Sequence, residues 1–213
     1  MRIIVPMAGM GKRMRPHTLT VPKPLVKVAG KPIVEHLVND IAQLAGGKVD
    51  EVAFIIGRFG EAVEKQLMTV ADHVGAKGSI YYQDDALGTA HAIYMAEQSL
   101  EGPCVVAFAD TLFHADFQLD VDADGIIWTN YVEDPRQFGV VNMDADGYIT
   151  EFEEKPAEPK SNEAIIGIYY FRQAEILRDE IKYLLDNNIT GGGEYQITDA
   201  LENMRGKGLK FKS

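Results

Sequence analysis

The basic residues near the amino terminus could together bind a small polyanion. The first 31 residues contain seven basic and no acidic residues, which leaves 14 basic and 32 acidic residues to the rest of the chain. Gly9 and Gly11 form a turn among them, and glycine can take the backbone angles that a sharp turn needs. Such a turn can aim peptide N–H groups at phosphate oxygens, while basic side chains supply the countercharge. We therefore expect a phosphate site formed by this turn and by Arg2, Lys12, Arg13, Arg15, Lys23, Lys27 and Lys31.

Two further polar side chains follow predicted strands. Gln83 ends the run at 79–83, and Asp110 follows the apolar run at 103–109. An amide can pair with the polar edge of a nucleobase, and a carboxylate is an oxygen ligand that suits Mg²⁺ beside phosphates. Taken alone, each residue is more often structural. Because both lie at the ends of predicted strands, where ligands bind in mostly parallel sheets, we interpret them as ligand-binding residues.

Short apolar runs alternate with amphipathic stretches through the first half of the chain, which predicts a βαβαβαβ order. We expect these strands to form a mostly parallel sheet with helices on both faces, and ligands to bind at the carboxyl ends of the strands. Thr89 is a plausible N-cap of the third helix. The predicted strands cover 3–5, 51–56, 79–83 and 103–109, and the predicted helices cover 32–44, 61–74 and 89–99.

The second half is richer in strands. The dipeptide Asp146-Gly147 is a strong hairpin signal. We expect this half to extend the same sheet, so that residues 1–213 form a single domain with a Rossmann-like α/β fold. The predicted strands cover 125–132, 138–143, 148–153 and 164–171, and two helices are predicted at 174–186 and 195–204.

Composition limits the partners and the compartment. The net charge of −11 argues against a general nucleic-acid or membrane-surface binder, so a small polyanion is the expected partner. Cys104 is the only cysteine and is expected to be a small buried hydrophobe, which fits a reducing cytoplasm. The amino terminus does not read as a signal peptide, and no apolar run of 18 residues predicts a membrane span.

The glycine turn departs from two familiar phosphate loops. A dinucleotide-binding fingerprint needs glycine at position 14, where this chain has Met14. A Walker loop needs glycine at position 6 and serine or threonine at position 13, where this chain has Pro6 and Arg13. Instead the amino-terminal region resembles the signature of the sugar-1-phosphate nucleotidylyltransferases, GxGTRxxPxT followed by PKxLxxxxxKPxI. The resemblance lies in three segments, AGMGKRMRP (8–16), PKPL (22–25) and GKPI (30–33). Lys12 stands where that family usually has threonine. The matching positions are Gly9, Gly11, Arg13, Pro16, Thr18, Lys23, Leu25, Lys31, Pro32 and Ile33.

This resemblance implies a nucleotide site and a catalytic set. The fold would be similar to that of glycosyltransferase-A enzymes, Arg13 would hold the departing pyrophosphate, Lys23 would brace the phosphates, and Asp110 would be the Mg²⁺ ligand. Gln83 with the segment around Gly88 resembles the part of the family that reads the base. The implied catalytic residues are Arg13, Lys23 and Asp110, and the implied nucleotide-binding residues are Ala8, Gly9, Gly11, Lys12, Arg13, Gln83 and Gly88.

The resemblance also implies a sugar-phosphate site farther along the chain. Lys155 would bind the phosphate of a sugar 1-phosphate, Glu154 would accept hydrogen bonds from ring hydroxyls, and Gly139 would allow close approach. The family usually carries a WxDxG segment with a second metal ligand, expected here just after residue 212. We therefore expect either a chain truncated at its carboxyl terminus, which is the favoured interpretation, or an incomplete metal site. The implied sugar-phosphate residues are Gly139, Glu154, Lys155, Asn162 and Gly167.

The sequence thus predicts an enzyme that joins a nucleoside triphosphate to a sugar 1-phosphate and releases pyrophosphate. UTP or dTTP with glucose 1-phosphate is favoured. The alternatives are a mannose-1-phosphate guanylyltransferase, an enzyme similar to phosphocholine cytidylyltransferases, and a non-catalytic nucleotide-binding relative. A homo-oligomer is compatible with the sequence.

Overall fold

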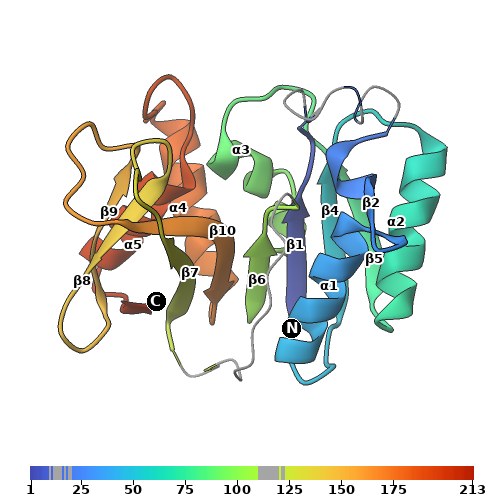
Figure 1. Cartoon of the computed structure of the whole chain (residues 1–213), viewed down its shortest axis with the longest axis horizontal. Helices are drawn as coiled ribbons and strands as arrows, with labels where there is room; N and C mark the ends of the chain where they lie inside the picture. The colour runs from blue at the N-terminus through green and yellow to red at the C-terminus, as the bar shows by residue number, and fades with distance from the viewer. Residues whose placement is uncertain (10, 12–15, 17, 19–20, 110–119, 121–122) are drawn as a thin grey trace.

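A mixed sheet forms the centre of the molecule (Figure 1). The computed structural model describes residues 1–9, 11, 16, 18, 21–109, 120 and 123–213. Within them the main path of the sheet has the order β11-β7-β10-β6-β1-β4-β5, with β8 paired to β10 and β9 paired to β8. The strands are β1 (Arg2–Pro6), β4 (Glu51–Ile56), β5 (Lys77–Tyr82), β6 (Cys104–Ala107), β7 (Gly125–Tyr131), β8 (Gly139–Met143), β9 (Ile149–Glu154), β10 (Glu163–Phe171) and β11 (Phe211–Lys212).

The amino-terminal strands are parallel, as the sequence predicts. On β1, Ile4 lies in register with Ala53 on β4 and with Val106 on β6. The chain moves from β1 outward through β4 to β5 and then returns to the other side of β1 with β6. The strand order therefore reverses between β1 and β6, and ligands of such sheets bind in the crevice beyond the carboxyl ends of the strands at that point.

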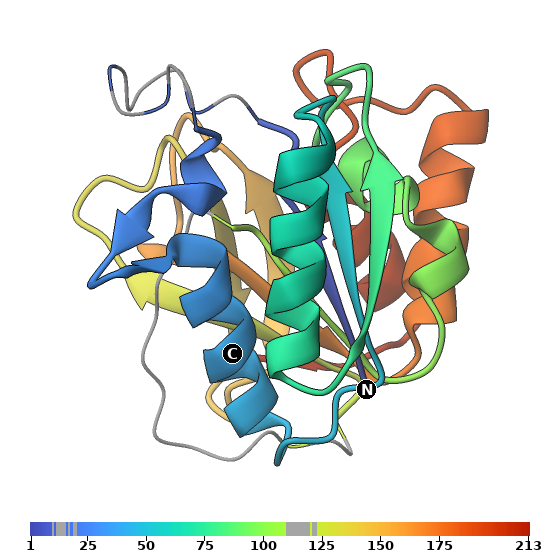
Figure 2. The same ribbon diagram turned by 90° about the vertical axis from the view of Figure 1, so that its right-hand side faces the viewer.

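Alternation along β1 assigns side chains to two hydrophobic clusters. Ile3 and Val5 belong to the cluster beneath α1 (Ile33–Leu44) and α2 (Glu61–His73), and Ile4 belongs to the cluster on the opposite face. That second cluster includes residues of α3 (Thr89–Tyr94), α4 (Ala174–Asp186) and α5 (Ile197–Gly206). Figure 2 shows α1 and α2 on one side of the parallel strands and α4 on the other. The prediction of helices on both faces is confirmed.

The carboxyl-terminal half extends the same sheet with antiparallel strands. β10 pairs antiparallel with both β6 and β7, and β8 and β9 form a hairpin. In the hairpin turn, Oδ1 of Asp144 accepts hydrogen bonds from the backbone N–H groups of Asp146 and Tyr148, and Gly147 has a φ of 80°. The hairpin predicted at Asp146-Gly147 is therefore confirmed.

The predicted helix at 89–99 is wrong in its length and in its cap. It is divided into α3 and the 3-10 helix η3 (Glu97–Ser99), where the Ser99 hydroxyl donates to Oε1 of the buried Glu51. Thr89 does not cap α3, whose N-cap is Gly88. Its Oγ1 instead accepts a hydrogen bond from the N–H of Ile197, at the start of α5, 2.9 Å away. A distant helix therefore uses the hydroxyl that the local sequence assigns to α3.

Two predictions from composition meet the structure directly. Cys104 is fully buried, and burial raises the pKa of its thiol to about 12, so its interpretation as a buried hydrophobe is confirmed. No described helix combines the length and the apolar character that crossing a bilayer requires.

Candidate functional site

The glycine turn and the lysine predicted to brace phosphates lie against each other. Gly11 has a φ of 59°, and a Cβ atom there would lie only 2.7 Å from Cβ of Lys23, so the lysine stem passes directly over the glycine. The buried Thr18 donates a 2.7 Å hydrogen bond from its hydroxyl to the Gly11 carbonyl oxygen. Lys23 begins η2 (Lys23–Leu25), which is fixed through the buried side chain of Leu25. The structure thus brings together two predicted site residues 12 positions apart.

This turn leaves the end of β1 beside β4. The N–H of Met7 donates to the carbonyl of Ile55, and a Cβ atom at Gly57 would lie 3.4 Å from the carbonyl oxygen of Ala8. Gly9 is exposed, with open space where a side chain would be. The predicted Ala8 and Gly9 contacts therefore sit at the carboxyl edge of the sheet, where a phosphate site is expected.

Four predicted residues, Lys12, Arg13, Arg15 and Asp110, lie outside the described residues. Ala109, which precedes Asp110, is described, and its N–H donates to the carbonyl of Pro6 at 3.4 Å. The end of β6 is thereby held beside the end of β1. Over the described parts of the chain, no group of three or more His, Cys, Asp or Glu side chains could hold a metal ion.

Gln83 is half-buried directly after β5, and its side chain has a defined partner. Its N–H donates to the carbonyl of Ile56, and its Nε2 lies 3.1 Å from Nδ1 of His91 on α3. Burial lowers the pKa of His91, and the charge of Asp85 opposes this effect. The imidazole is therefore neutral at neutral pH, and in the tautomer with its proton on Nε2 its Nδ1 can accept a hydrogen bond from the Gln83 amide.

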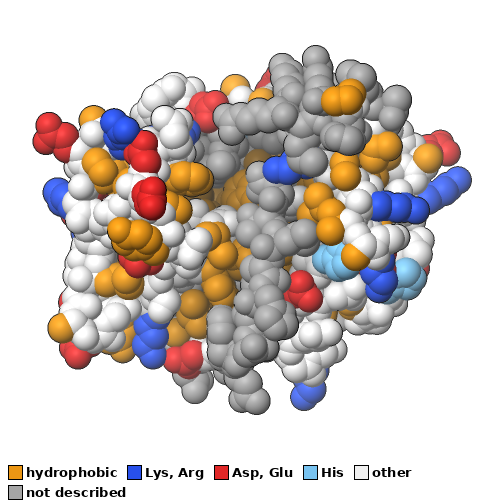
Figure 3. Space-filling view, viewed as in Figure 1, with side chains coloured by type: hydrophobic (Ala, Val, Ile, Leu, Met, Phe, Trp, Pro, Cys, Tyr) orange, Lys and Arg blue, Asp and Glu red, His pale blue; other side chains and the backbone are white. Residues whose placement is uncertain are grey.

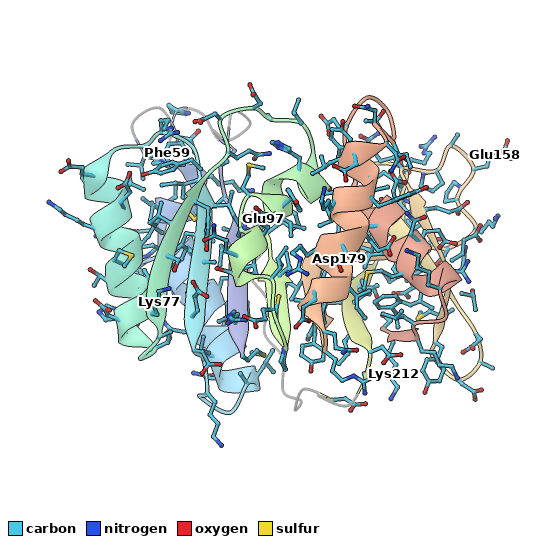
Figure 4. The ribbon with its side chains drawn as sticks, turned by 180° about the vertical axis from the view of Figure 1, so that it is seen from behind. Phe59, Lys77, Glu97, Glu158, Asp179 and Lys212 are labelled. Carbon is cyan, nitrogen blue, oxygen red and sulfur yellow. The ribbon has the colours of Figure 1, made fainter. Side chains whose placement is uncertain are left out.

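Arg58 contacts the residues on either side of Gln83 at the end of β5. Its guanidinium makes two hydrogen bonds of 2.8 Å to the carboxylate of Asp84 and lies 4.0 Å from the centre of the Tyr82 ring. Tyr82 in turn donates from its hydroxyl to Glu64 on α2. Figure 4 shows the neighbouring Phe59 near the upper end of α2, with Lys77 below it near the other end of that helix. The backbone that carries Gln83 is thus held on both sides.

Gly88 permits a close approach of another backbone segment. It has a φ of 121°, and a Cβ atom there would lie 2.3 Å from the carbonyl oxygen of Tyr195. The N–H of Tyr195 donates to the carbonyl of Leu87 at 2.8 Å, and the N–H of Ala90 donates to the carbonyl of Tyr195 at 3.0 Å. The requirement for glycine at this position therefore follows from Tyr195, whereas the resemblance ascribes it to a nucleobase.

The predicted sugar-phosphate residues Gly139, Glu154 and Lys155 come together at the open end of the β8–β9 hairpin. Gly139 and Glu154 are direct cross-strand partners, and a Cβ atom at Gly139 would lie 3.1 Å from Oε2 of Glu154. Nζ of Lys155 lies 3.4 Å from Oε1 of Glu154. Lys155 has a φ of 45° and donates its N–H to the carbonyl of Phe138. The side chains of Glu154, Thr198 and Ile165 fill the space that a side chain at position 139 would take, so glycine lets the carboxylate pack close to the neighbouring strand.

Two other predicted sugar-phosphate residues support the backbone. Nδ2 of Asn162 donates to the carbonyls of Val132 and Glu133, at 2.7 and 3.2 Å. Gly167 has a φ of 82° within a register shift of β10, and its carbonyl accepts a hydrogen bond of 2.9 Å from the N–H of Phe108. Gly167 therefore lies beside Phe108, which directly follows β6 and comes just before Ala109 and Asp110. Asn162 instead shapes the turn after β7.

The sequence interpretation missed residues on the segment that begins α5. Thr198 is buried and donates from its hydroxyl to Oε2 of Glu154 at 3.1 Å. Burial raises the pKa of the next residue, Asp199, and the charge of Glu154 adds to that effect. The only signal in the sequence is a polar run after the three glycines at 191–193, which does not reveal its distant partners. Tyr195 was missed for the same reason. His91 was missed although its partner, Gln83, is only eight positions away.

One face of the molecule is hollowed near its centre. Figure 3 shows hydrophobic side chains on the floor of a depression near the centre of one face, with the β8–β9 hairpin on one side and the amino-terminal segments on the other. The residues predicted to bind phosphates after β1 and the predicted sugar-phosphate residues Glu154 and Lys155 after β9 thus come from the two halves of the sheet. This arrangement suits a ligand that carries phosphates at one end and hydroxyl groups at the other.

Comparison with known proteins identifies relatives along nearly the whole chain. The family model described as nucleotidyl transferase matches residues 3–211. The low-salt glycan biosynthesis nucleotidyltransferase Agl11 of Haloferax volcanii is 32% identical over 212 residues, which cover 96% of this chain and 57% of that protein. The mannose-1-phosphate guanylyltransferase catalytic subunit beta of Drosophila pseudoobscura pseudoobscura is 34% identical over 190 residues, which cover 85% of this chain and 50% of that protein.

A solved structure supports the same fold. The crystal structure of UDP-glucose pyrophosphorylase complexed with UDP-glucose superimposes with a TM-score of 0.77 at 24% identity, and covers 100% of this chain and 89% of that one. The present chain spans about half the length of the curated relatives that it matches.

Proposed function

Because the chain belongs to the nucleotidyl transferase family, we propose that it transfers a nucleotidyl group from a nucleoside triphosphate to a sugar 1-phosphate. The products are a nucleotide sugar and pyrophosphate. The observation that carries this proposal is the packing of the Lys23 stem over Gly11, at the carboxyl end of β1. A cation beside a glycine turn at this edge of the sheet suits the phosphates of a nucleotide.

The reaction needs positioning and charge rather than a covalent intermediate. An ionised phosphate oxygen of the sugar 1-phosphate attacks the α-phosphorus, a new P–O bond forms, and the bond to the β-phosphate oxygen breaks as pyrophosphate leaves. The phosphoryl oxygens gather charge during this displacement, so cations placed near them lower its barrier. We assign that role to Lys23 and to Arg13, with Lys155 holding the phosphate of the attacking substrate.

We further propose Mg²⁺ as the cofactor and Asp110 as its ligand. A carboxylate that follows a buried strand, next to a phosphate site, is an oxygen donor that suits Mg²⁺. When bound, the ion would neutralise charge on the phosphate oxygens. The described neighbour of Asp110, Ala109, is held beside β1 by its hydrogen bond to Pro6, which supports placing the metal near the glycine turn.

The sugar phosphate is assigned to the end of β9. Glu154 supplies an acceptor for hydroxyl groups, Lys155 supplies a cation, and Gly139 lets the Glu154 carboxylate pack against the adjacent strand. Asn162 and Gly167 remain in the proposed set through the backbone that they support. We also propose that residues 1–213 act as a single domain, and the single buried Cys104 is compatible with a reducing compartment such as the cytoplasm.

For the base, we favour UTP or dTTP with glucose 1-phosphate, read by Gln83 next to Leu87 and Gly88. A second candidate is GTP with mannose 1-phosphate, which the 34% identity to a mannose-1-phosphate guanylyltransferase subunit supports. Both candidates place the phosphates at Lys23 and the sugar at Glu154.

Pyrophosphate release tests the proposal. The protein is incubated with Mg²⁺, each of UTP, dTTP, GTP, CTP and ATP, and each of glucose 1-phosphate, mannose 1-phosphate and phosphocholine. We expect release with a sugar 1-phosphate and the highest rate with UTP or dTTP. Release with phosphocholine alone would overturn the sugar assignment. Nucleotide binding without release in any combination, also by a chain extended past residue 213, would favour a non-catalytic binding protein.

A further inference from the structure

The side chain of Gln83 can face a nucleobase in either of two ways. Its carbonyl and its NH₂ group exchange places when the amide turns over. Uracil presents an N–H beside a carbonyl on its edge, and cytosine presents an unprotonated ring nitrogen beside an amino group. An amide that is free to turn over can pair with both edges, whereas a fixed amide distinguishes them. Whatever holds the amide therefore sets base selectivity.

His91 is the group that contacts this amide. Its Nδ1 lies 3.1 Å from Nε2 of Gln83. A neutral imidazole that accepts through Nδ1 can satisfy the NH₂ group but not the carbonyl, because the carbonyl oxygen is itself an acceptor. A ring proton on Nδ1 would fix the amide the other way round, so the premise is the tautomer with its proton on Nε2 of the ring, for which the contact permits one of the two amide orientations. In this orientation Nε2 is directed at His91, and the carbonyl with the second N–H is left for a ligand.

The support of His91 is rigid. It lies in the first turn of α3, whose start is held by two backbone hydrogen bonds to Tyr195 and by the contact of Thr89 with Ile197. Alternation along β5 directs the Gln83 side chain to the same face as Tyr81, whose hydroxyl contacts Ser99 beyond α3. Both members of the pair are thus carried by fixed backbone, so the amide orientation depends on their hydrogen bond.

We propose that His91 is a positioning residue that fixes the Gln83 amide and thereby makes the site select an imide base, uracil or thymine, over cytosine. This inference rests on the proposed function, because that function places the base at Gln83. The burial that lowers the pKa of His91 keeps its ring neutral, as the acceptor role requires, against the opposing charge of Asp85.

Two replacements of His91 separate this role from a packing role. His91→Leu keeps a similar volume and removes the acceptor. His91→Asn removes the ring but can offer a carbonyl oxygen close to the position of Nδ1. Dissociation constants for UTP and CTP are measured by calorimetry for the wild-type chain and both variants, with pyrophosphate release measured in parallel. The unfolding midpoint of each variant shows whether it is folded.

We expect the wild-type chain to bind UTP more tightly than CTP. His91→Leu should reduce the ratio of the CTP dissociation constant to the UTP dissociation constant about fivefold to tenfold, as the loss of one hydrogen bond allows. His91→Asn should restore most of the ratio. In a Gln83→Leu background, His91→Leu should change the ratio no further, because its effect passes through the amide. A ratio that His91→Leu leaves unchanged in a folded variant would overturn the inference.

The same measurements keep the two proposals apart. A wild-type chain that binds no nucleoside triphosphate and releases no pyrophosphate overturns the proposed function, and the role of His91 with it. A wild-type preference for CTP overturns the assignment to uracil or thymine. Binding of UTP with an altered ratio in His91→Leu, but without turnover, supports the positioning role while the transfer reaction itself fails.

Discussion

Thr198 and Glu154 join the start of α5 to the end of β9 through one hydrogen bond, 3.1 Å long, from the threonine hydroxyl to Oε2 of the carboxylate. The other oxygen, Oε1, faces Nζ of Lys155 at 3.4 Å. Both carboxylate oxygens therefore have a donor before any ligand arrives. The carboxylate proposed to receive sugar hydroxyls is thus held in place from two sides, one of them buried.

Thr198→Val should weaken the binding of the sugar phosphate. The substitution keeps the shape of the side chain and removes the hydroxyl, so that Glu154 loses one fixed donor, which costs about 1 kcal/mol or roughly fivefold in affinity. We expect KM for the sugar 1-phosphate to rise by about that factor while KM for the nucleotide changes little. Thr198→Ser, which keeps the hydroxyl, is the matched control. Equal KM values in the valine and serine variants would contradict this role.

Lys23→Ala should reduce turnover by about 10²-fold or more, the range found when one donor to a developing charge is removed. The first carbons of the Lys23 side chain lie over Gly11, so the lysine starts from the turn where we propose that the phosphates bind. Lys65→Ala is a suitable control because that side chain is 82% exposed on α2, away from the turn. Steady-state pyrophosphate release measures both variants, and near-normal turnover in Lys23→Ala would refute the assignment.

The parallel half of the fold could be predicted from the sequence because its signals are local. Alternation along β1 already separates Ile3 and Val5 from Ile4, and the structure divides them between two clusters in that way. The Lys23 assignment came from a short stretch of matching residues, and its contact with Gly11 spans only 12 positions. Local patterns therefore predict the parallel strands correctly, and they also single out Lys23 as a candidate residue for the phosphate site.

The other side of the site depends on contacts that no local pattern carries. Thr89 reads as a cap for its own helix, yet its hydroxyl accepts from Ile197, which is 108 residues away. Gly88 reads as a place for a ligand, yet the Tyr195 backbone fills the space that a side chain would take. Secondary-structure propensity depends on a residue and its neighbours in sequence. It therefore cannot predict a hydrogen bond or close contact with a residue that is distant in the sequence.

Gly11→Ala should destabilise the fold as well as the phosphate site. Alanine at a φ of 59° costs about 1–2 kcal/mol, and its Cβ would also lie 2.7 Å from Cβ of Lys23. Gly30→Ala is the matched control, since Gly30 has a φ of 86° but open space around it. Urea unfolding should therefore show a larger loss of stability for Gly11→Ala than for Gly30→Ala. Equal losses would mean that the lysine stem moves aside without cost.

The neutral state of His91 predicts how stability responds to acid. Burial lowers the pKa of the folded residue below the ordinary 6.5, so the unfolded chain takes up a proton at this site before the folded chain does. The free energy of unfolding should therefore fall with pH from about 6.5 down to the lowered pKa, and this contribution should level off below it. His91→Asn has no group that titrates there, so its urea unfolding curves, measured from about pH 7.5 to about pH 5, should show a shallower loss than the wild type. The remaining titratable groups are shared by both proteins, and parallel pH profiles would show that His91 is protonated equally in the folded and unfolded chains.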